Sequence, residues 1–364
     1  MKKIAVFGST GSVGKQALDV VASHADELKL VCIAARSNRE LLALQAERFA
    51  PVTCILTQDD PQGLVRYAEQ GDYDVLLVAV TGLHGLQPTL AALSRGKTVA
   101  LANKESLVLG GEFVKKAQIC GGGTLLPVDS EHAALHQCLL SRRAVSSLVL
   151  TCSGGALREY PIEKLATVTP SDVLAHPTWD MGVKITVDCA TMVNKAFEVA
   201  EAHYLFDLPY EAIEVVIHPQ SIVHSMVRFA DGAVLAQLAN PDMRLPIQYA
   251  LTYPRCVPSL VKPLDFDGLS LQFSHYDPAR YPLFDLGVEC LSHGGQKAIA
   301  FAASDEVAVK AFVERSISFD KIYTIIADTA AHFEGAVADV GQIFEVYQQA
   351  ERYAQGEVER LICC

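Results

Sequence analysis

Short apolar runs alternate with amphipathic stretches over the first third of the chain, from Lys2 to about Pro127. Continuous apolar runs separated by helical patterns are typical of a parallel sheet that is buried on both faces. We therefore expect an α/β domain in which helices cover both sides of a doubly wound parallel sheet. The runs that predict its strands are Ile4–Phe7, Leu30–Ala34, Thr53–Leu56, Val75–Val80, Thr98–Leu101 and Thr124–Val128.

The pattern changes after residue 128, where strands and helices no longer alternate regularly. Asp231-Gly232 lies between two apolar runs and is typical of a hairpin turn. A helix is expected over Thr191–Phe206, so we predict an α+β domain in the middle of the chain. The runs that predict its strands are Val145–Thr151, Glu214–Ile217, Ile222–Phe229 and Ala233–Leu238.

The rest of the chain consists of a long polar connection, a proline-containing stretch and a region with mostly helical patterns from Gly294 onward. Long connections in compact domains are often lids, so we expect a lid over residues 153–183. The predicted division is a doubly wound domain at 1–128, an α+β catalytic domain at 129–252, a linker at 253–282 and a C-terminal helical domain at 283–364.

Composition narrows the classes of function. The formal net charge of the 364 residues is −12, which argues against non-specific nucleic-acid binding because that needs a basic face. We find no apolar run long enough for a signal sequence or a membrane span, so we expect a cytoplasmic protein without membrane contact. The ten cysteines form no CxxC pair, and we interpret them as reduced.

A glycine-rich turn follows the first predicted strand and precedes a helical pattern. It reads Gly8-Ser9-Thr10-Gly11-Ser12-Val13-Gly14. In a Rossmann-like domain the first glycine permits a tight bend, the second lets the backbone approach a pyrophosphate, and the third lets the helix pack on the strand. The phosphates then meet the helix N-terminus. The turn therefore predicts a dinucleotide site, and a plain strand-to-helix turn is the alternative.

The residues after the second predicted strand indicate which dinucleotide binds. An acidic residue there would hold the ribose 2′-hydroxyl of NAD. This chain instead has Ala35-Arg36-Ser37-Asn38, whose polar side chains can hold a 2′-phosphate. We therefore predict NADPH. The alternative is that Arg36 and Arg39 are solvated charges at the start of a helix.

Two acidic residues follow the sixth predicted strand, at the edge where open α/β sheets bind their ligands. Asp129 and Glu131 would point the same way on extended backbone. Two carboxylates on one face suit a hard cation such as Mg²⁺ or Mn²⁺. The alternative is a helix start, with Asp129 as the N-cap and Glu131 in the first turn. We interpret His132 and His136 as helix-face residues rather than metal ligands.

Lys195 and Glu198 lie on one face of the helix expected over Thr191–Phe206, because they are three residues apart. Glu198 is a candidate for a third metal carboxylate. A surface ion pair is the alternative, and the spacing alone leaves both interpretations open.

Several longer segments resemble the 1-deoxy-D-xylulose 5-phosphate reductoisomerases, a family of enzymes of the non-mevalonate route to isoprenoids. The matching segments occur in the family's order and cover the chain from residue 1 to about residue 310. Their combination is far more specific than any single motif. They are the glycine turn, Leu101–Val108, Pro127–His132, Ser153–Gly155, His176–Gly182, Lys184–Asp188, Asn194-Lys195 and His218–Met226.

The resemblance implies roles for individual residues. Asp129, Glu131 and Glu198 would bind the metal, which would be Mg²⁺ or Mn²⁺, with Co²⁺ as an alternative. The implied catalytic residues are these three together with Lys104, His176, Lys195 and His224. The implied substrate-binding residues are Lys104, Ser130, Glu131, Ser153, His176, Trp179, Met181, Cys189, Asn194, Lys195 and Glu198. The implied cofactor-binding residues are Gly8, Ser9, Thr10, Gly11, Ser12, Val13, Gly14, Ala35, Arg36, Ser37, Asn38, Asn103, Lys104, Glu105, Gly182 and Met243.

The implied reaction is a skeletal rearrangement of a small phosphorylated sugar, 1-deoxy-D-xylulose 5-phosphate (DXP), followed by hydride transfer from NADPH to give 2-C-methyl-D-erythritol 4-phosphate. The family also implies a homodimer, for which the strands from Ile222 to Leu238 would supply an intersubunit sheet. One alternative is a simpler NADP-dependent dehydrogenase of the semialdehyde or homoserine type, which needs no site with three carboxylates. Another is an NADPH-binding sensor without catalysis.

Three segments depart from the family pattern. Cys189 stands where the family usually has a serine that contacts the phosphate, and a thiol is a weaker donor. Ala156-Leu157 stands where Pro-Phe is usual, and Ala302–Glu306 stands where Asn-Ala-Ala-Asn-Glu is typical. We expect Cys189 to lower the affinity for substrate without changing the chemistry.

Overall fold

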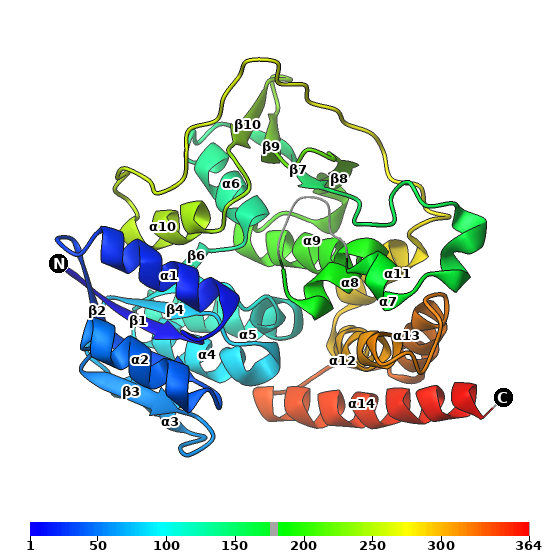
Figure 1. Ribbon diagram of the computed structural model, residues 1–364, viewed down its shortest axis with the longest axis horizontal. Coiled ribbons are helices and arrows are strands. Elements are labelled where there is room, and N and C mark those ends of the chain that lie inside the picture. Colours follow the sequence, from blue (N-terminus) through cyan, green and yellow to red (C-terminus); the bar gives the residue numbers. More distant parts are fainter. Residues whose placement is uncertain (175–180, 364) are drawn as a thin grey trace. The chain divides into compact units, whose positions relative to one another are not determined.

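The computed structural model describes residues 1–174 and 181–363 (Figure 1). The chain forms two compact units. Unit 1 comprises Met1–Val145 and His224–Asp267, and unit 2 comprises Ser146–Val223 and Gly268–Cys364. The two units begin and end at other residues than the predicted domains. The predicted domain boundaries remain a proposal.

Unit 1 contains a sheet of six parallel strands in the order β3-β2-β1-β4-β5-β6. The strand order reverses between β1 and β4, so the sheet is doubly wound and the predicted α/β fold is confirmed. Each strand predicted for this sheet is present, with ends shifted by no more than two residues. The strands are β1 (Lys2–Phe7), β2 (Leu28–Ala35), β3 (Thr53–Leu56), β4 (Val75–Val78), β5 (Thr98–Leu101) and β6 (Thr124–Pro127).

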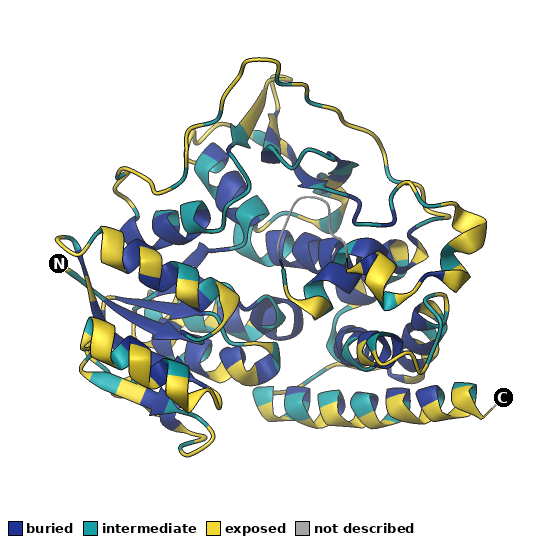
Figure 2. Cartoon of the chain, in the orientation of Figure 1, coloured by how far each residue is buried: buried dark blue, intermediate teal, exposed yellow. Residues whose placement is uncertain are grey.

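Apolar side chains bury the central strands of this sheet on both faces. Ile4 and Val6 of β1 are fully buried in one cluster with Val20 and Ile247, which lie on two helices that cover the sheet. Phe7, which alternates with Val6 along the strand, is fully buried as well. Burial of each such side chain stabilises the fold by roughly 1.5–3 kcal/mol. Figure 2 shows these central strands in the dark blue of buried residues.

Helices and a hairpin complete unit 1. The predicted hairpin turn is confirmed, because Gly232 has a φ of +84° and Phe229 N donates to Ala233 O at 2.9 Å. The strands that it joins are β9 (Val223–Phe229) and β10 (Val234–Leu238). The helices of this unit are α1 (Ser12–Ser23), α2 (Arg39–Phe49), α3 (Gly63–Gln70), η1 (Gly82–Gly85), α4 (Leu86–Ser94), α5 (Glu105–Gly121), α6 (Ser130–Leu139) and α10 (Arg244–Thr252).

Unit 2 combines a parallel pair of strands with the helices of the C-terminal region. The strands are β7 (Val145–Cys152) and β8 (Ile213–Ile217). The predicted helical C-terminal region is confirmed, and its first helix begins at Pro282. The helices of this unit are η2 (Ile162–Thr167), α7 (Pro170–Val173), α8 (Val183–Thr191), α9 (Val193–Phe206), η3 (Tyr210–Ala212), α11 (Pro282–His293), α12 (Gly295–Val313), α13 (Lys321–His332) and α14 (Val340–Ile362).

The helix predicted over Thr191–Phe206 corresponds to α9. A separate helix, α8, precedes it, over residues for which the sequence pattern predicts no element. Met192 separates the two helices, because its φ of +60° is left-handed and cannot continue a right-handed helix. The short break lets α8 and α9 take different directions while they remain neighbours in the chain.

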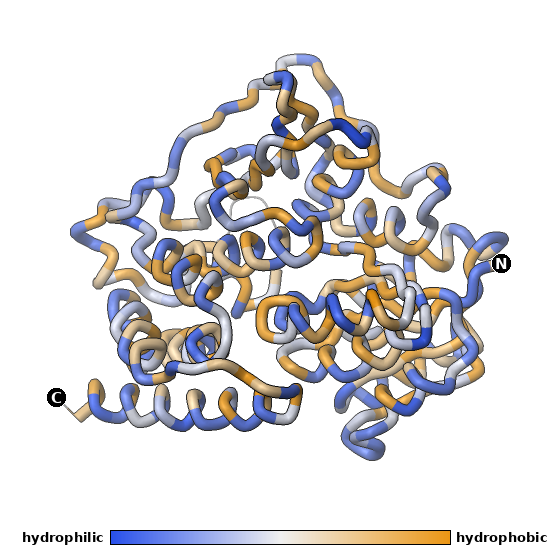
Figure 3. Tube along the Cα trace, turned by 180° about the vertical axis from the view of Figure 1, so that it is seen from behind, coloured by the Kyte–Doolittle hydropathy of each residue, from blue (hydrophilic) through white to orange (hydrophobic). Residues whose placement is uncertain are grey.

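Helix α14 is amphipathic. Its buried residues recur every three or four positions, which is the spacing of one helix face. Apolar and polar segments alternate along it in Figure 3. The buried residues are Ile343, Val346, Ala350, Ala354 and Val358. None of the helices within residues 1–174 and 181–363 has both the length and the apolar character that crossing a bilayer requires.

Candidate active site

The glycine turn after β1 brings backbone segments into very close approach. Gly8 has a φ of +88°, a left-handed conformation that favours glycine. A side-chain carbon at Gly8 would lie 2.3 Å from Ala79 O, and one at Gly14 would lie 2.1 Å from Gly8 O. Helix α1 begins at Ser12 without a side-chain cap, since its N-cap residue is Gly11. This geometry suits a turn whose helix N-terminus receives phosphate oxygens.

Ser9 lies in this turn, but its side chain faces inward. It is fully buried, and its hydroxyl donates to Gln45 Oε1 at 2.7 Å. Gln45 Nε2 donates in return to Ser9 O at 2.9 Å, and Ser9 N donates to Ala34 O at 2.9 Å. These bonds tie the turn to α2 and to β2. Ser9 would therefore serve a dinucleotide by fixing the shape of the turn.

The segment predicted to hold a 2′-phosphate follows β2 directly. Ala35 is buried, whereas Arg36, Ser37 and Asn38 are exposed. Asn38 Oδ1 accepts a hydrogen bond from Leu41 N at 3.1 Å and so caps α2. The Arg36 guanidinium, the Ser37 hydroxyl and the Asn38 side-chain nitrogen are the side-chain donors that this segment offers to an anion.

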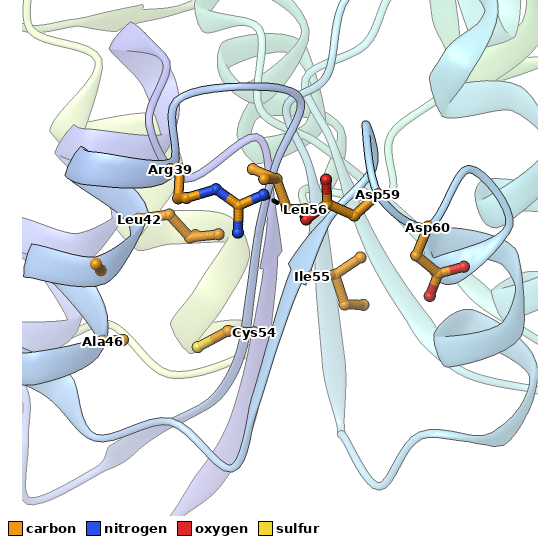
Figure 4. Close-up of a pocket in the computed structure, with 9 residues that line it drawn as sticks. Arg39, Leu42, Ala46, Cys54, Ile55, Leu56, Asp59 and Asp60 are labelled. Atoms are coloured by element: carbon orange, nitrogen blue, oxygen red, sulfur yellow. Dashed lines mark hydrogen bonds and ion pairs between the residues drawn. The ribbon is translucent and has the colours of Figure 1, made fainter.

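Arg39 lies in a different environment from Arg36. Its Nη2 is 2.6 Å from Asp59 Oδ2, and Figure 4 shows the side chain pointing toward that carboxylate across a pocket. The pocket has a volume of about 380 Å³ and lies between α2 and β3. None of the predicted cofactor residues lines it, and we assign it no ligand. Arg39 is therefore paired within the protein, in an ion pair that is exposed to solvent.

Asn103 joins the loops that follow β4 and β5. Its Nδ2 donates to Val80 O at 3.0 Å, to Gly82 O at 2.9 Å and to Glu105 Oε2 at 2.6 Å. Glu105 Oε1 accepts from Gly82 N at 3.1 Å. An amide that is only 1% exposed needs such partners. Asn103 and Glu105, both predicted cofactor residues, thus shape the loops at the carboxyl edge of the sheet, where ligands bind in α/β folds.

Lys104 and Asp129 follow the neighbouring strands β5 and β6 and form an ion pair. Lys104 Nζ lies 3.0 Å from Asp129 Oδ2, and the Ser130 hydroxyl donates to the carboxylate of Glu131. The expectation of extended backbone at this point is wrong, because α6 begins at Ser130 and Glu131 lies in its first turn. Asp129 occupies the N-cap position, but its carboxylate does not cap the helix and pairs with Lys104 instead.

A buried polar cluster lies on α9 in unit 2. Asn194, Lys195 and Glu198 are 9%, 3% and 2% exposed, so the alternative of a surface ion pair is wrong. Lys195 Nζ and Asn194 Nδ2 both donate to the Glu198 carboxylate, and Lys195 Nζ also donates to Thr151 O at 2.5 Å. Burial of charged groups is costly, and a buried pair is weak support for stability. The cluster therefore favours a role in function.

The turn at Ser153 packs against the end of α8. Gly155 has a φ of +69°, and a side-chain carbon there would lie 2.6 Å from the Cα of Ala190. Ser153 Oγ accepts a hydrogen bond from Gly155 N at 3.1 Å. Unit 2 therefore brings the Ser153 turn to the helix end that carries Cys189, as a phosphate pocket built from both residues requires.

The first part of the predicted lid is anchored within unit 2. Tyr281 OH donates to Gly154 O at 2.8 Å, and Arg280 Nη1 donates to Leu157 O at 2.8 Å and to Tyr160 O at 2.6 Å. Leu157 is 2% exposed. A lid that moves would therefore break these bonds or begin after Tyr160.

Two residues predicted for the lid region, His176 and Trp179, lie outside the described residues. Met181 and Gly182 directly precede α8, and Gly182 is the N-cap residue of that helix. The C-terminal limit predicted for the lid therefore coincides with the start of α8.

The remaining predicted residues belong to unit 1. His224 is buried in β9, and Met243 packs against the apolar core of the unit just before α10. By unit, Lys104, Asp129, Ser130 and Glu131 lie in unit 1, whereas Ser153, Cys189, Asn194, Lys195 and Glu198 lie in unit 2.

Comparison with known proteins covers nearly the whole chain. A model of the family described as 1-deoxy-D-xylulose 5-phosphate reductoisomerase matches residues 4–66 and 53–111. Two models of the C-terminal domains of the same enzyme match residues 125–206 and 238–353. Together these matches follow the order of the motifs noted in the sequence.

Relatives of the same name match over their full length. The protein from Thermomicrobium roseum is 43% identical over 99% of this chain and 97% of its own. The protein from Geobacter metallireducens is 44% identical over 94% of this chain and 95% of its own.

Solved structures agree with the sequence comparison. The reductoisomerase from Zymomonas mobilis in complex with NADPH is 35% identical, with a TM-score of 0.90 over 98% of this chain and 99% of that one. A reductoisomerase in complex with NADPH, fosmidomycin and magnesium is 34% identical, with a TM-score of 0.90 over 99% of both chains. The chain therefore belongs to the 1-deoxy-D-xylulose 5-phosphate reductoisomerase family.

Proposed function

We propose that the chain converts DXP to 2-C-methyl-D-erythritol 4-phosphate, in a reaction that requires NADPH and a divalent cation. The observation that carries this proposal is the match over the full length to relatives that bear the name of this enzyme. Solved relatives with the same fold hold NADPH and magnesium. The protein is thus an oxidoreductase of the non-mevalonate route of isoprenoid biosynthesis.

Unit 1 would hold NADPH, which supplies the hydride for the reduction. The turn from Gly8 to Gly14 suits this cofactor, because its closely packed backbone leads into α1, whose N-terminus has no side-chain cap and can receive phosphate oxygens. Arg36 would pair with the 2′-phosphate. We propose that Asn103 and Glu105 hold the neighbouring loops in shape and that Met243 lies beside the nicotinamide.

Asp129, Glu131 and Glu198 would hold the divalent cation, which acts when bound as a Lewis acid toward the substrate's oxygens. The donor set fits Mg²⁺ or Mn²⁺, because three carboxylates offer hard oxygen ligands. Each carboxylate has a polar partner in its own unit: Lys104 for Asp129, Ser130 for Glu131, and Lys195 with Asn194 for Glu198. These partners keep the acidic groups oriented.

The substrate would be held by donors at both of its ends. Lys104, Ser130 and Asn194 would donate to the sugar oxygens, and Lys195 with Ser153 would take the phosphate, to which the family also assigns His176. The phosphate group of the substrate is a dianion, and the protein has a net charge of −12. The site therefore needs several hydrogen-bond donors close together to bind the phosphate. Binding energy from the phosphate would close the lid over the reacting carbons and exclude water. A rearrangement that breaks and re-forms a carbon–carbon bond depends on this confinement.

Three finer statements are part of the proposal. We propose that Cys189 is a weaker phosphate contact than the serine usual in the family. We propose a homodimer in which β10 lies at the subunit interface. We also propose a cytoplasmic location and a lid within residues 153–183.

The test is the oxidation of NADPH, followed by its ultraviolet absorbance, with DXP as the second substrate. We expect turnover with Mg²⁺ or Mn²⁺, loss of turnover after chelation, and recovery when metal is returned. Glu198→Gln should lower turnover by at least about a hundredfold, because it weakens a metal ligand. NADPH binding is the control and should persist, since unit 1 holds the cofactor. Turnover in the presence of chelator, or none with either metal, would contradict the proposed function.

A further inference from the structure

A second charged cluster lies inside unit 2, outside the residues assigned above. Lys184 Nζ donates to Asp188 Oδ2 at 2.5 Å, one turn along α8, and also to the carboxylate of Asp305 on α12. The side chains of Asp188 and Asp305 are 6% and 0% exposed. Asp305 Oδ1 is buried with no hydrogen-bond partner in the part of the chain that the structure describes. The Asp305 carboxyl therefore depends on Lys184 for compensation of its burial.

The electrostatics agree with this geometry. Burial raises the pKa of the Asp305 carboxyl, and Lys184 opposes the rise. Burial alone would lower the pKa of Lys184, but the two carboxyls raise it above its ordinary value. Lys184 thus stays charged at neutral pH. The Lys184 side chain is 37% exposed, whereas the two carboxyls are buried. Loss of the lysine charge is damaging, because it leaves the buried carboxyls uncompensated.

Lys184 also contacts a third helix. Its Nζ lies 5.8 Å from the ring centre of Phe197 on α9, within the range of a cation–π contact. Phe197 packs edge-on against Phe301 of α12, with ring centres 5.8 Å apart. Helix α8 packs against both α9 and α12 (Figure 1). One ammonium group therefore links three helices.

Two of these helices carry the proposed phosphate pocket. Cys189 follows Asp188 directly on α8, and Asn194 and Lys195 lie on α9. Helix α12 carries none of the predicted site residues and can serve as a fixed support. A shift of α8 along α9 would change the distance between Cys189 and Lys195, although both must meet the same phosphate.

We propose that Lys184 is a positioning residue for the phosphate end of the substrate and that Asp188 and Asp305 anchor it. This inference rests on the proposed function. Lys184 acts through α8, which it holds against α9 and α12. Misplacement of a binding group by about 1 Å can cost about a hundredfold in rate. Because the affected group binds phosphate, the loss falls on the KM for DXP rather than on the KM for NADPH.

The test is steady-state kinetics of Lys184→Met and Lys184→Arg beside the wild-type enzyme. We expect Lys184→Met to raise the KM for DXP by about tenfold or more and the KM for NADPH by less than about twofold. Lys184→Arg should restore most of the affinity, because arginine can still pair with both carboxyls. Lys310→Met is the matched control on α12. Lys310 forms an exposed pair with Glu314 at 3.9 Å, and its loss should change neither constant.

Equal rises in both KM values, a fall in kcat alone, or no change in the KM for DXP would overturn the proposal. If Lys184→Met does not fold, Asp305→Asn decides, because it removes one charge at nearly constant size. A rise of about threefold in the KM for DXP alone supports positioning by this cluster, and no rise overturns it. Absence of turnover by the wild-type enzyme would overturn the proposed function, and this inference with it.

Discussion

Arg36 and Arg39 lie three residues apart where the chain passes from β2 to α2, yet the structure gives them different surroundings. Arg39 is paired with Asp59, whereas Arg36 is exposed at the end of β2. Both arginines were candidates for a plain solvated charge. We propose Arg36 for the 2′-phosphate of NADPH, because it follows β2 directly, in the segment predicted to hold that group.

This difference predicts distinct effects on cofactor choice. Arg36→Gln should raise the KM for NADPH by about tenfold to a hundredfold, because a charge-assisted bond to phosphate is lost. The KM for NADH should stay nearly constant, since NADH has no 2′-phosphate. Arg39→Gln is the matched control and should have little effect, because its ion pair is exposed. Steady-state kinetics with both cofactors decides, and equal losses in the two variants would disprove the assignment to Arg36.

At the residue scale, the sequence pattern predicts which polar side chains belong to the site, but it does not predict their hydrogen-bond partners. The spacing of Lys195 and Glu198 predicted that they share a helix face, but it left open whether that face is exposed. Burial depends on β7, which supplies Thr151 O to Lys195 from 44 positions earlier in the chain. A backbone carbonyl has no mark in the sequence, so this contact was not predictable. The same holds for Gln45, which secures Ser9 through hydrogen bonds.

At the scale of elements, the apolar runs predicted the strands of unit 1 because buried parallel strands have little polar sequence. The pattern predicts no element between the polar connection and Thr191, where the structure has α8. The break between α8 and α9 depends on the left-handed backbone of Met192, a conformation that methionine rarely adopts. The pattern at Ser130 allows either extended backbone or a helix start, and the structure has the helix.

Strand β10 is the element that best fits the proposed dimer interface. It is an edge strand beside β9, and its residues Val234 and Leu235 are 44% and 39% exposed. Exposed edges with apolar side chains are templates for pairing with another chain. In a symmetric interface a residue i of one copy contacts a residue j of the other and j contacts i, so a change on β10 acts on both sides of the interface.

This arrangement predicts the effect of a charge on β10. The wild-type chain should be a dimer in solution, and Leu235→Lys should shift it toward monomer, because the interface would have to bury an unpaired ammonium group on each of its two sides. Ile119→Lys is the control, since Ile119 is 76% exposed on α5, away from the hairpin. Analytical ultracentrifugation at several concentrations gives the answer. A monomeric wild type, or a Leu235→Lys variant that dimerises as well as wild type, would disprove this interface.

At the scale of the whole molecule, the proposed cofactor-binding and metal-binding residues are divided between the two units. Unit 1 has the turn and the arginine suited to NADPH, and it has two of the three proposed metal carboxylates. Unit 2 has the third carboxylate within the buried cluster of α9. The fold class was predictable from apolar periodicity. The reaction was predictable only from the resemblance, because periodicity and charge alone also allow a simple dehydrogenase.

The central claim is that the hydride reduces a rearranged carbon skeleton. The most direct test uses DXP that carries carbon-13 at the two carbons joined by the bond that the rearrangement breaks. The labelled substrate is incubated with the chain, NADPH and Mg²⁺, and the product is examined by NMR. We predict a branched product in which the one-bond coupling between the two labels is lost. A reduced product that keeps the linear skeleton and the coupling would identify a simple dehydrogenase and contradict the proposed function.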